Sequence, residues 1–389
     1  MRKFIVFLTV LLFLSGCEKK VEEIPEVLQY EEIQINAIWF SYVDYRDNMQ
    51  NLSEKNFSKK VDEIINNFVE DGINTIYLHT VSFTDAFYDS KIYPKTQILP
   101  EIDYDPLNIF LEKAHNKSIR VEAWINPMRS FTVEEASSIS DDFIIKKWIN
   151  EEKPYVKNVN GRYYLNPAYQ EVIDLILSVV KELVNDYDID GIHMDDYFYP
   201  DDVTEEFDFE IYTERCLNIC SLSRFRKDNV NNLVALINKE VKKAGLVYGI
   251  SPSGNMSYSV DTVYGDFNAW VDAGTVDYLI PQIYWGYDHP TKPFKETLDE
   301  WIQVIKDSDV DLIVGLAAYK IAAEDIYAKD GKYEWIENTD IISRQIEDAK
   351  LLNTKGISLF SYQSLYEPDD DIKEHVNKEK SNIKLKLKE

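Results

Sequence analysis

The chain has 389 residues, of which 69 are acidic and 42 are basic, so its formal net charge is −27. This charge argues against nucleic acid or anionic lipid as a ligand, because both bind through basic patches. Hydrophobic residues make up 45% of the chain, which is enough for a large core, and the length fits one large domain or two ordinary ones.

The N-terminal segment has the features of an export signal. A basic start, Arg2-Lys3, precedes an apolar run of 11 residues, Phe4–Leu14. This run is too short to span a bilayer and has the length of a signal-peptide core. It ends in Leu-Ser-Gly-Cys, which resembles a bacterial lipoprotein processing site with Cys17 as the lipidated residue. We therefore expect residues 1–17 to be a lipoprotein signal peptide and its cysteine; an ordinary signal peptide cleaved nearby is the alternative.

Lipidation would determine where the protein works. Acyl chains on Cys17 would tether an exported domain to a bacterial membrane, facing the cell envelope or the outside. Residues 18–34 are charged and show no packing period, so we expect a flexible stalk there. Cleavage before Cys17 removes Arg2 and Lys3, and the mature charge becomes 40 − 69 = −29.

Eight short β-like runs follow, most of them separated by segments with apolar residues at helical spacing. The runs cover residues 36–42, 75–80, 120–126, 191–197, 247–252, 277–285, 311–319 and 356–362. Strands that alternate with helices form a parallel sheet, and eight such units close into a (β/α)8 TIM barrel, an α/β fold. A doubly wound open sheet is the alternative, but no glycine-rich phosphate turn follows the first run. We therefore predict one barrel domain over residues 35–365.

The connections also carry predictions. The segments 127–170 and 198–227 are long and leave the C-terminal ends of predicted strands, so we expect both to build walls or lids over a cleft. Cys216 and Cys220 lie four apart in a predicted helix, where a disulfide is geometrically awkward, so we expect two small buried residues. Residues 366–389 are expected to form a C-terminal tail, of which the part 374–389 is basic and predicted to be frayed.

The runs begin apolar and end in polar or aromatic side chains. Those at the ends are Tyr42, His79, Trp124, Asn126, Asp195, Asp196, Ser251, Gln282, Tyr284, Trp285, Tyr319 and Tyr362. In a barrel these ends gather on the C-terminal face, where the active sites of this fold lie. Two adjacent carboxylates repel each other. Because the same polarity gradient recurs in nearly all the runs, Asp195-Asp196 indicates a site rather than one solvated strand end.

Carboxylates and aromatic rings in a cleft suggest sugar chemistry. Glycoside hydrolysis needs two carboxyl groups, and aromatic rings stack on the apolar faces of sugars. Asp195 and Asp196 are the best catalytic candidates. Glu122 is the third, or else a buried structural partner of His193 or Arg129. The predicted substrate-binding residues are Tyr42, His79, Asp85, Trp124, Asn126, Arg129, Asn166, His193, Tyr197, Gln282, Tyr284, Trp285 and Tyr362.

The histidines are a weak metal signal, and we expect neither a metal nor a cofactor. Because the run 247–252 carries no carboxylate, the catalytic acid must come from Asp196, Glu122 or a loop carboxylate. The loop candidates are Asp44, Asp85 and Asp266.

Several longer motifs resemble, in sequence order, those of the bacterial glycosyl hydrolase-like family ten. They include "VEAWINPMR", "YGISPSGN", "VDYLIPQIYW" and the segment Asp190–Pro200, which follows the family pattern D-G-[IV]-H-x-D-D-Y-F-Y-P. At two positions this chain differs from many members, with Glu122 in place of His and Ser253 in place of an aromatic residue. The resemblance implies an exported (β/α)8 glycosidase, and members of the family are linked to cleavage of peptidoglycan glycan strands.

The sequence therefore predicts an exported, membrane-anchored glycoside hydrolase that acts on a cell-wall or cell-surface glycan, most of all peptidoglycan glycan strands. A glycan-binding lipoprotein without catalysis is the alternative, because aromatic platforms and amides serve binding equally well. A metal-dependent polysaccharide deacetylase is a third interpretation, but that chemistry usually needs a compact Asp-His-His set that the sequence does not supply.

Overall fold

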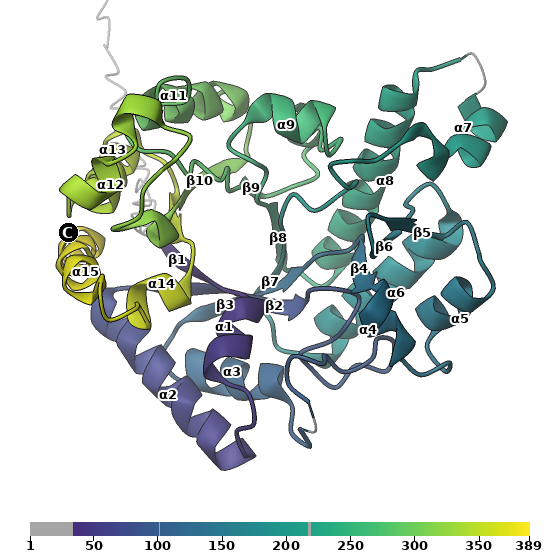
Figure 1. Ribbon diagram of the computed structural model, residues 1–389, viewed down its shortest axis with the longest axis horizontal. Coiled ribbons are helices and arrows are strands. Elements are labelled where there is room, and N and C mark those ends of the chain that lie inside the picture. The colour runs from purple at the N-terminus through teal and green to yellow at the C-terminus, as the bar shows by residue number, and fades with distance from the viewer. Residues whose placement is uncertain (1–33, 101, 217–218) are drawn as a thin grey trace, which may run out of the picture. The chain divides into compact units, whose positions relative to one another are not determined.

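The computed structural model describes residues 34–100, 102–216 and 219–389 (Figure 1). The predicted signal peptide, Cys17 and the stalk up to residue 33 lie outside the described residues. Eight parallel strands form a closed barrel, and the barrel strands follow one another around it in the order in which they occur along the chain. They are β1 (Ile35–Phe40), β2 (Thr75–Val81), β3 (Arg120–Ile125), β7 (Gly191–Met194), β8 (Val247–Ile250), β9 (Tyr278–Leu279), β10 (Asp311–Leu316) and β11 (Gly356–Leu359). The predicted TIM barrel is confirmed.

The strands are shorter than the predicted runs and stop before the polar residues. β7 ends at Met194, so that Asp195 and Asp196 stand in the loop that follows it. β9 has only two residues, because Pro281 has no N–H to donate to a neighbouring strand. Beyond Pro281, isolated bridges join Gln282 to Ser253 and Gly315 and carry the barrel wall onward.

Helices surround the barrel (Figure 1). The larger ones are α2 (Glu54–Asp71), α3 (Pro106–His115), α6 (Gln170–Asp186), α8 (Leu222–Lys243), α11 (Phe294–Ile305) and α13 (Ile341–Leu351). The shorter ones are α1 (Tyr42–Asn48), α9 (Met256–Asp261), α10 (Phe267–Ala273), α12 (Glu334–Glu337), α14 (Tyr362–Tyr366), η2 (Ala318–Lys320) and η3 (Lys329–Gly331). In α2 the buried residues Phe57, Val61, Ile64 and Phe68 recur at helical spacing, which gives the helix one apolar face for the barrel.

The long connection after β3 forms a small antiparallel sheet in the order β4-β6-β5. Its elements are β4 (Arg129–Thr132), α4 (Val133–Ser137), α5 (Ile144–Asn150), β5 (Val156–Val159) and β6 (Arg162–Leu165). β5 and β6 are joined by Asn160-Gly161, whose φ angles of 51° and 86° are those of a tight hairpin turn. We call residues 129–165 the arm. Its strands pair with one another and not with the barrel.

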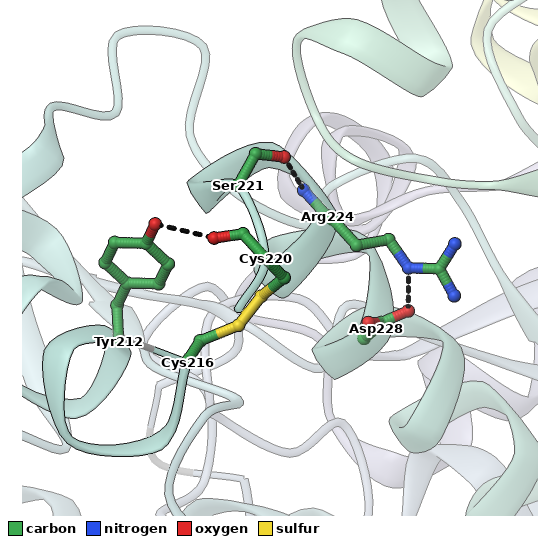
Figure 2. Close-up of a disulfide and its surroundings, with 6 residues drawn as sticks. All are labelled: Tyr212, Cys216, Cys220, Ser221, Arg224 and Asp228. Atoms are coloured by element: carbon green, nitrogen blue, oxygen red, sulfur yellow. Dashed lines mark hydrogen bonds and ion pairs between the residues drawn. A yellow bond between two sulfur atoms is a disulfide. The ribbon is translucent and has the colours of Figure 1, made fainter. Parts of the chain in front are cut away.

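The connection after β7 contains η1 (Glu205–Phe207) and α7 (Phe209–Cys216), and it holds a disulfide between Cys216 and Cys220 (Figure 2). The prediction of two unlinked buried cysteines is therefore wrong. α7 ends at Cys216 and α8 begins only at Leu222, so the pair does not lie on one continuous helix. The Tyr212 hydroxyl donates to the Cys220 carbonyl at 2.8 Å and fixes this turn.

The C-terminal segment is also different from its prediction. Instead of a frayed tail it forms α15 (Lys373–Lys388), which packs on α13 and α2. Val376, Ile383 and Leu387 are buried on one face of this helix, although lysines surround them in the sequence. The helix also caps the bottom of β1, where the Leu387 carbonyl accepts a hydrogen bond from Asn36 Nδ2 at 3.2 Å.

The described residues form three clusters of buried hydrophobic side chains. The largest lies between the strands and the helices, and the second fills the inside of the barrel with residues that include Trp39, Tyr77, Trp124 and Tyr278. A small third cluster joins Ala168, Ile211, Cys216 and Phe225. Among the described residues, no helix is both long enough and apolar enough to cross a membrane.

Candidate active site

A cavity of about 330 Å³ opens at the C-terminal ends of the barrel strands. It is lined by Trp39, Ser41, Tyr42, Val43, His79, Trp124, Asn126, Asp195, Asp196, Tyr197, Ser251, Gln282, Tyr284, Tyr319 and Phe360. Each of the eight strands, or the segment directly after it, contributes at least one of these residues. The barrel thus brings together nine of the predicted site residues: Tyr42, His79, Trp124, Asn126, Asp195, Asp196, Tyr197, Gln282 and Tyr284.

Asp195 is the deeper of the two adjacent carboxyl groups, with 5% of its surface exposed. Its Oδ2 accepts a hydrogen bond from Trp124 Nε1 at 3.2 Å, and its Oδ1 accepts one from the Tyr197 amide at 3.2 Å. Burial raises the pKa of Asp195 well above its usual range, and the charge of Asp196 adds to this rise. The carboxyl group of Asp195 is therefore harder to ionise than that of an exposed aspartate.

Asp196 is half-buried and lies at the same cavity. Gln282 Nε2 donates to its Oδ1 at 3.3 Å and also to the Ser251 carbonyl at 3.1 Å. Burial raises the pKa of Asp196 to about 6. Both carboxyl groups of the cavity therefore have raised pKa values, and burial of this kind is how a carboxyl group is tuned for acid–base catalysis.

Three buried polar atoms of the cavity residues have no hydrogen-bond partner among the described residues: His79 Nε2, Asn126 Nδ2 and Ser251 Oγ. His79 Nδ1 accepts a hydrogen bond from the Tyr42 amide at 3.3 Å, and burial lowers the pKa of His79 well below its usual value. The neutral ring therefore carries its proton on Nε2. Buried polar groups are normally paired, so these atoms are suited to the hydroxyl and amide groups of a ligand.

Aromatic rings form much of the remaining surface. The ring of His79 stacks on Trp124 at 3.8 Å between centroids, which fixes both side chains. Trp39 packs edge-on against Phe360, and Tyr284 packs edge-on against Tyr319. The cavity thus combines flat apolar faces with a few hydrogen-bonding groups, as sites for sugars do.

Two further cavities adjoin the first because they share lining residues with it. One, of about 300 Å³, lies on the side of the arm and shares Asp196 and Tyr197. The other, of about 410 Å³, shares Gln282, Tyr284 and Tyr319 and contains Trp285. Because the cavities share these residues, we refer to the three together as the groove, and Asp195 and Asp196 line the cavity that shares residues with both of the others.

Glu122 and His193 face into the barrel but do not line the cavity. Glu122 Oε2 accepts from the Tyr278 hydroxyl at 2.5 Å, and its other oxygen lies 3.5 Å from Arg120. The two nitrogens of His193 contact Trp39 Nε1 and the Tyr278 hydroxyl. This geometry favours the structural role for Glu122, although with Tyr278 and Arg120 as partners, and it leaves neither residue free to contact a substrate.

Other predicted residues serve the fold. Asp85 accepts hydrogen bonds from the amides of Ser82 and Phe83, and Asn166 bonds the Phe207 carbonyl and the Ala168 amide. Neither lines the cavity, and both hold loops in place. Tyr362 is buried in the core at the start of α14, where its hydroxyl bonds Glu367. The structure thus places these three residues outside the cavity lining, although they were predicted to contact the substrate.

The loop carboxylates proposed as acids are also occupied elsewhere. Asp44 caps α1 and bonds the Gln363 amide, and Asp266 caps α10. Neither lines the cavity. Asp195 and Asp196 are thus the only carboxylates among the described residues of the cavity lining.

The sequence interpretation omitted several lining residues. Trp39 and Phe360 looked like core residues of their runs, although the position of Trp39, two residues after the inward-facing Ala37, marks it as inward-facing. Arg162 of the arm was not singled out, because it belongs to a connection whose internal hairpin was not predicted. Among the described residues, no group of three His, Cys, Asp or Glu side chains is arranged to hold a metal ion.

Residues 34–334 match the model of the family described as Glycosyl hydrolase-like 10. The chain belongs to this family. It is 29% identical over 318 residues to "Glycosyl hydrolase YngK" of Bacillus subtilis (strain 168), covering 74% of this chain and 61% of the relative. It is 30% identical over 278 residues to "Glycosyl hydrolase DigH" of Escherichia coli (strain K12), covering 64% and 63%. The chain thus spans about three fifths of the length of these relatives.

Solved glycoside hydrolases share the fold of this Glycosyl hydrolase-like 10 member. The glycoside hydrolase domain of PgaB (BpsB) from Bordetella bronchiseptica has a TM-score of 0.57 at 13% identity, covering 90% of this chain and 97% of that domain. A GH113 β-1,4-mannanase has a TM-score of 0.54 at 12% identity, covering 91% and 99%. At these identities the likeness establishes the fold alone.

Proposed function

We propose that this protein is an exported, lipid-anchored glycoside hydrolase that cleaves a cell-wall glycan, with peptidoglycan glycan strands as its substrate. The observation that carries the proposal is the pair Asp195 and Asp196 in the middle of a groove at the barrel mouth. The groove leaves room for sugars on both sides of the pair, as a polymer requires. The names of the curated relatives, both glycosyl hydrolases, support the same class of activity.

The proposed mechanism divides the work between the two carboxyl groups. Asp195, the more deeply buried group, whose pKa burial raises, protonates the glycosidic oxygen as the bond to the anomeric carbon breaks. Asp196, which is ionised above about pH 6, acts on the anomeric carbon directly or through a water molecule. His79 and Asn126 would bind the hydroxyl groups of the sugar that is cleaved.

Export and anchoring rest on separate observations. The lipoprotein-type processing site at Cys17 supports lipidation. The Cys216–Cys220 disulfide supports export, because disulfides persist in oxidising compartments outside the cytosol.

The activity can be tested with the variants Asp195→Asn and Asp196→Asn. Purified proteins would be incubated with glycan strands stripped of peptides, and soluble fragments would be counted. Each variant should lower fragment release by about 10²- to 10⁴-fold, the contribution of a positioned acid or base. The melting temperature should stay the same or rise, because each change replaces a carboxyl group that burial makes costly to ionise. Asp272→Asn, an exposed change on α10, is the matched control and should behave as wild type.

The pH dependence of hydrolysis tests the role of Asp196. In the wild type, kcat/KM should fall as the pH drops below about 6, where Asp196 takes up a proton. Full activity in both variants would remove the pair from the mechanism. Binding of the glycan without release of fragments by the wild type would instead identify a glycan-binding lipoprotein.

A further inference from the structure

The cavity on the side of the arm contains two arginines, in a chain where acidic residues greatly outnumber basic ones. Arg129 begins β4 and Arg162 begins β6, and these two strands pair in the small sheet of the arm. The cavity also contains Asp196 and Tyr197, so it adjoins the proposed catalytic pair.

Arg129 has no salt bridge and no side-chain hydrogen bond to any residue that the structure describes, and its Nε atom is buried without a partner. Its guanidinium lies over the ring of Tyr197 at 4.4 Å and over that of Phe83 at 5.1 Å. These rings hold the group in place but satisfy none of its N–H donors. By contrast, the buried Arg226 is held by both oxygens of Asp208. A fixed guanidinium with unused donors is suited to a carboxylate or phosphate oxygen.

Arg162 lies close to Arg129, because its guanidinium is 4.4 Å from the same Phe83 ring. Burial lowers the pKa of Arg162, and the charge of Arg129 lowers it further. One of its nitrogens donates to the Ser130 carbonyl at 2.6 Å, and Glu135 lies 4.0 Å away at the edge. Two positive groups held together in this way repel each other, and a bound anion would relieve that repulsion.

Besides Asp196, which accepts a hydrogen bond from Gln282 Nε2, two carboxylates on the other wall of this cavity have partners of their own. Asp201 accepts a hydrogen bond from the Tyr258 hydroxyl, and Asp202 accepts one from Asn160 Nδ2 at 3.0 Å. Both are exposed at the rim, where solvent screens their charge. The arginines are half-buried and therefore act more strongly on a group inside the cavity.

We propose that the cavity on the arm side is a subsite for a sugar that carries a carboxylate, which Arg129 and Arg162 bind. This inference rests on the proposed function, because it takes the neighbouring Asp195 and Asp196 as the point of cleavage. The bound sugar would then lie next to the sugar that is cleaved. In a peptidoglycan strand, the lactyl group of a muramic acid residue supplies such a carboxylate wherever the peptide has been removed.

The test compares oligosaccharides from peptide-free glycan strands with the same oligosaccharides after reduction of their carboxyl groups to alcohols. Binding would be measured by calorimetry in the Asp195→Asn background, so that the ligands are not cleaved. The Asp195→Asn protein, which is the parent for the other variants, should bind the oligosaccharides with intact carboxyl groups (the acidic form) about 10- to 100-fold more tightly than the reduced ones. This is the expected effect of a hydrogen bond to a charged group. Arg129→Gln and Arg162→Gln should each remove most of this preference. Arg224→Gln removes an exposed guanidinium on α8 and should preserve the preference.

Arg129→Lys keeps the positive charge without the planar fork, so it should retain part of the preference, and it serves if Arg129→Gln does not fold. Equal binding of both forms by the parent, or an unchanged preference in both glutamine variants, would overturn the subsite. Hydrolysis by the protein with Asp195 intact is scored separately. If the protein prefers the acidic form in binding but hydrolyses neither form, the proposed hydrolase activity is refuted and the subsite stands. If it binds both forms equally and hydrolyses both, the subsite is refuted and the hydrolase activity stands.

Discussion

Glu122, Tyr278 and His193 form a buried hydrogen-bonded chain one layer below the cavity. Burial raises the pKa of Glu122 to about 7 and lowers that of His193 to about 3. Near neutral pH the histidine is therefore neutral and the glutamate is partly ionised. The chain ties β3, β7 and β9 together inside the barrel, and Trp39 on β1 joins it through His193.

This chain makes the stability of the protein depend on pH through Glu122. Between its ordinary pKa of 4.5 and its folded value of about 7, Glu122 holds a proton in the folded state that the unfolded chain has lost. Its contribution to stability is therefore present at low pH and is lost as the pH rises through 7. The free energy of unfolding of Glu122→Gln minus that of wild type should therefore be larger at pH 8 than at pH 5, by roughly 3 kcal/mol.

Urea denaturation at the two pH values measures this difference, with the exposed Glu300→Gln on α11 as a control that should show none. A difference between variant and wild type that does not change with pH would contradict the prediction. Loss of glycan hydrolysis in Glu122→Gln would restore Glu122 as a catalytic candidate.

The same residues show what strand parity can predict about the site. Parity correctly placed Glu122, Trp124 and Asn126 on one inward face, but it does not give depth along the barrel axis. Trp124 pairs with His193 in the β3–β7 register, and Glu122 lies two residues below, opposite Gly191. Depth depends on how the strands are staggered against one another, and this is a property of the closed barrel rather than of one strand.

At the scale of elements, the apolar runs predicted all eight barrel strands, because a buried parallel strand leaves a strong local signal. Two elements were missed for different reasons. The hairpin of the arm has strands of only four residues, although Asn160-Gly161 is a strong turn signal. In α15 the apolar residues are few and stand among lysines, so the sequence does not indicate a buried helix face. These residues are buried only because α13 and α2 provide a surface against which they pack.

The packing of α15 can be tested with two side chains of equal size. Ile383 is 2% exposed and Leu385 is 63% exposed on the same helix. Ile383→Ala should lower the free energy of unfolding by about 2–4 kcal/mol, whereas Leu385→Ala should change it by less than about 0.5 kcal/mol. Chemical denaturation followed by circular dichroism measures both. Equal effects of the two changes would mean that the segment does not pack as a helix on the barrel.

At the scale of the whole molecule, the count of eight βα units predicted the closed barrel and hence the face that carries the cavity. The two long connections, 127–170 and 198–227, were expected to form walls over that face, and residues of both line the cavity on the side of the arm. The course of each loop could not be predicted, because it depends on contacts that arise only after the barrel closes. Asp85 and Asn166 illustrate this point, since each holds a loop beside the site without entering it.

The proposed location of the molecule depends on Cys17. In cells that produce the full chain, the wild type should be found with membranes and should incorporate labelled fatty acid. Cys17→Ala should lose the label, and the protein should either be released from membranes or retain its signal peptide. Cys216→Ala is the matched control and should keep the label. Membrane-bound, acyl-labelled protein from Cys17→Ala would refute lipidation at this residue.

The arm has a consequence for how this protein could be altered. Its three strands pair only with one another, and it leaves the barrel after β3 and returns before α6. The carboxylates that would break the bond stand on the barrel, whereas the arginines that would select the sugar stand on this insertion. If both proposals hold, reaction and selection reside in separate pieces of chain. A library confined to residues 156–165 could redirect the protein to other polymers while its chemistry stays intact.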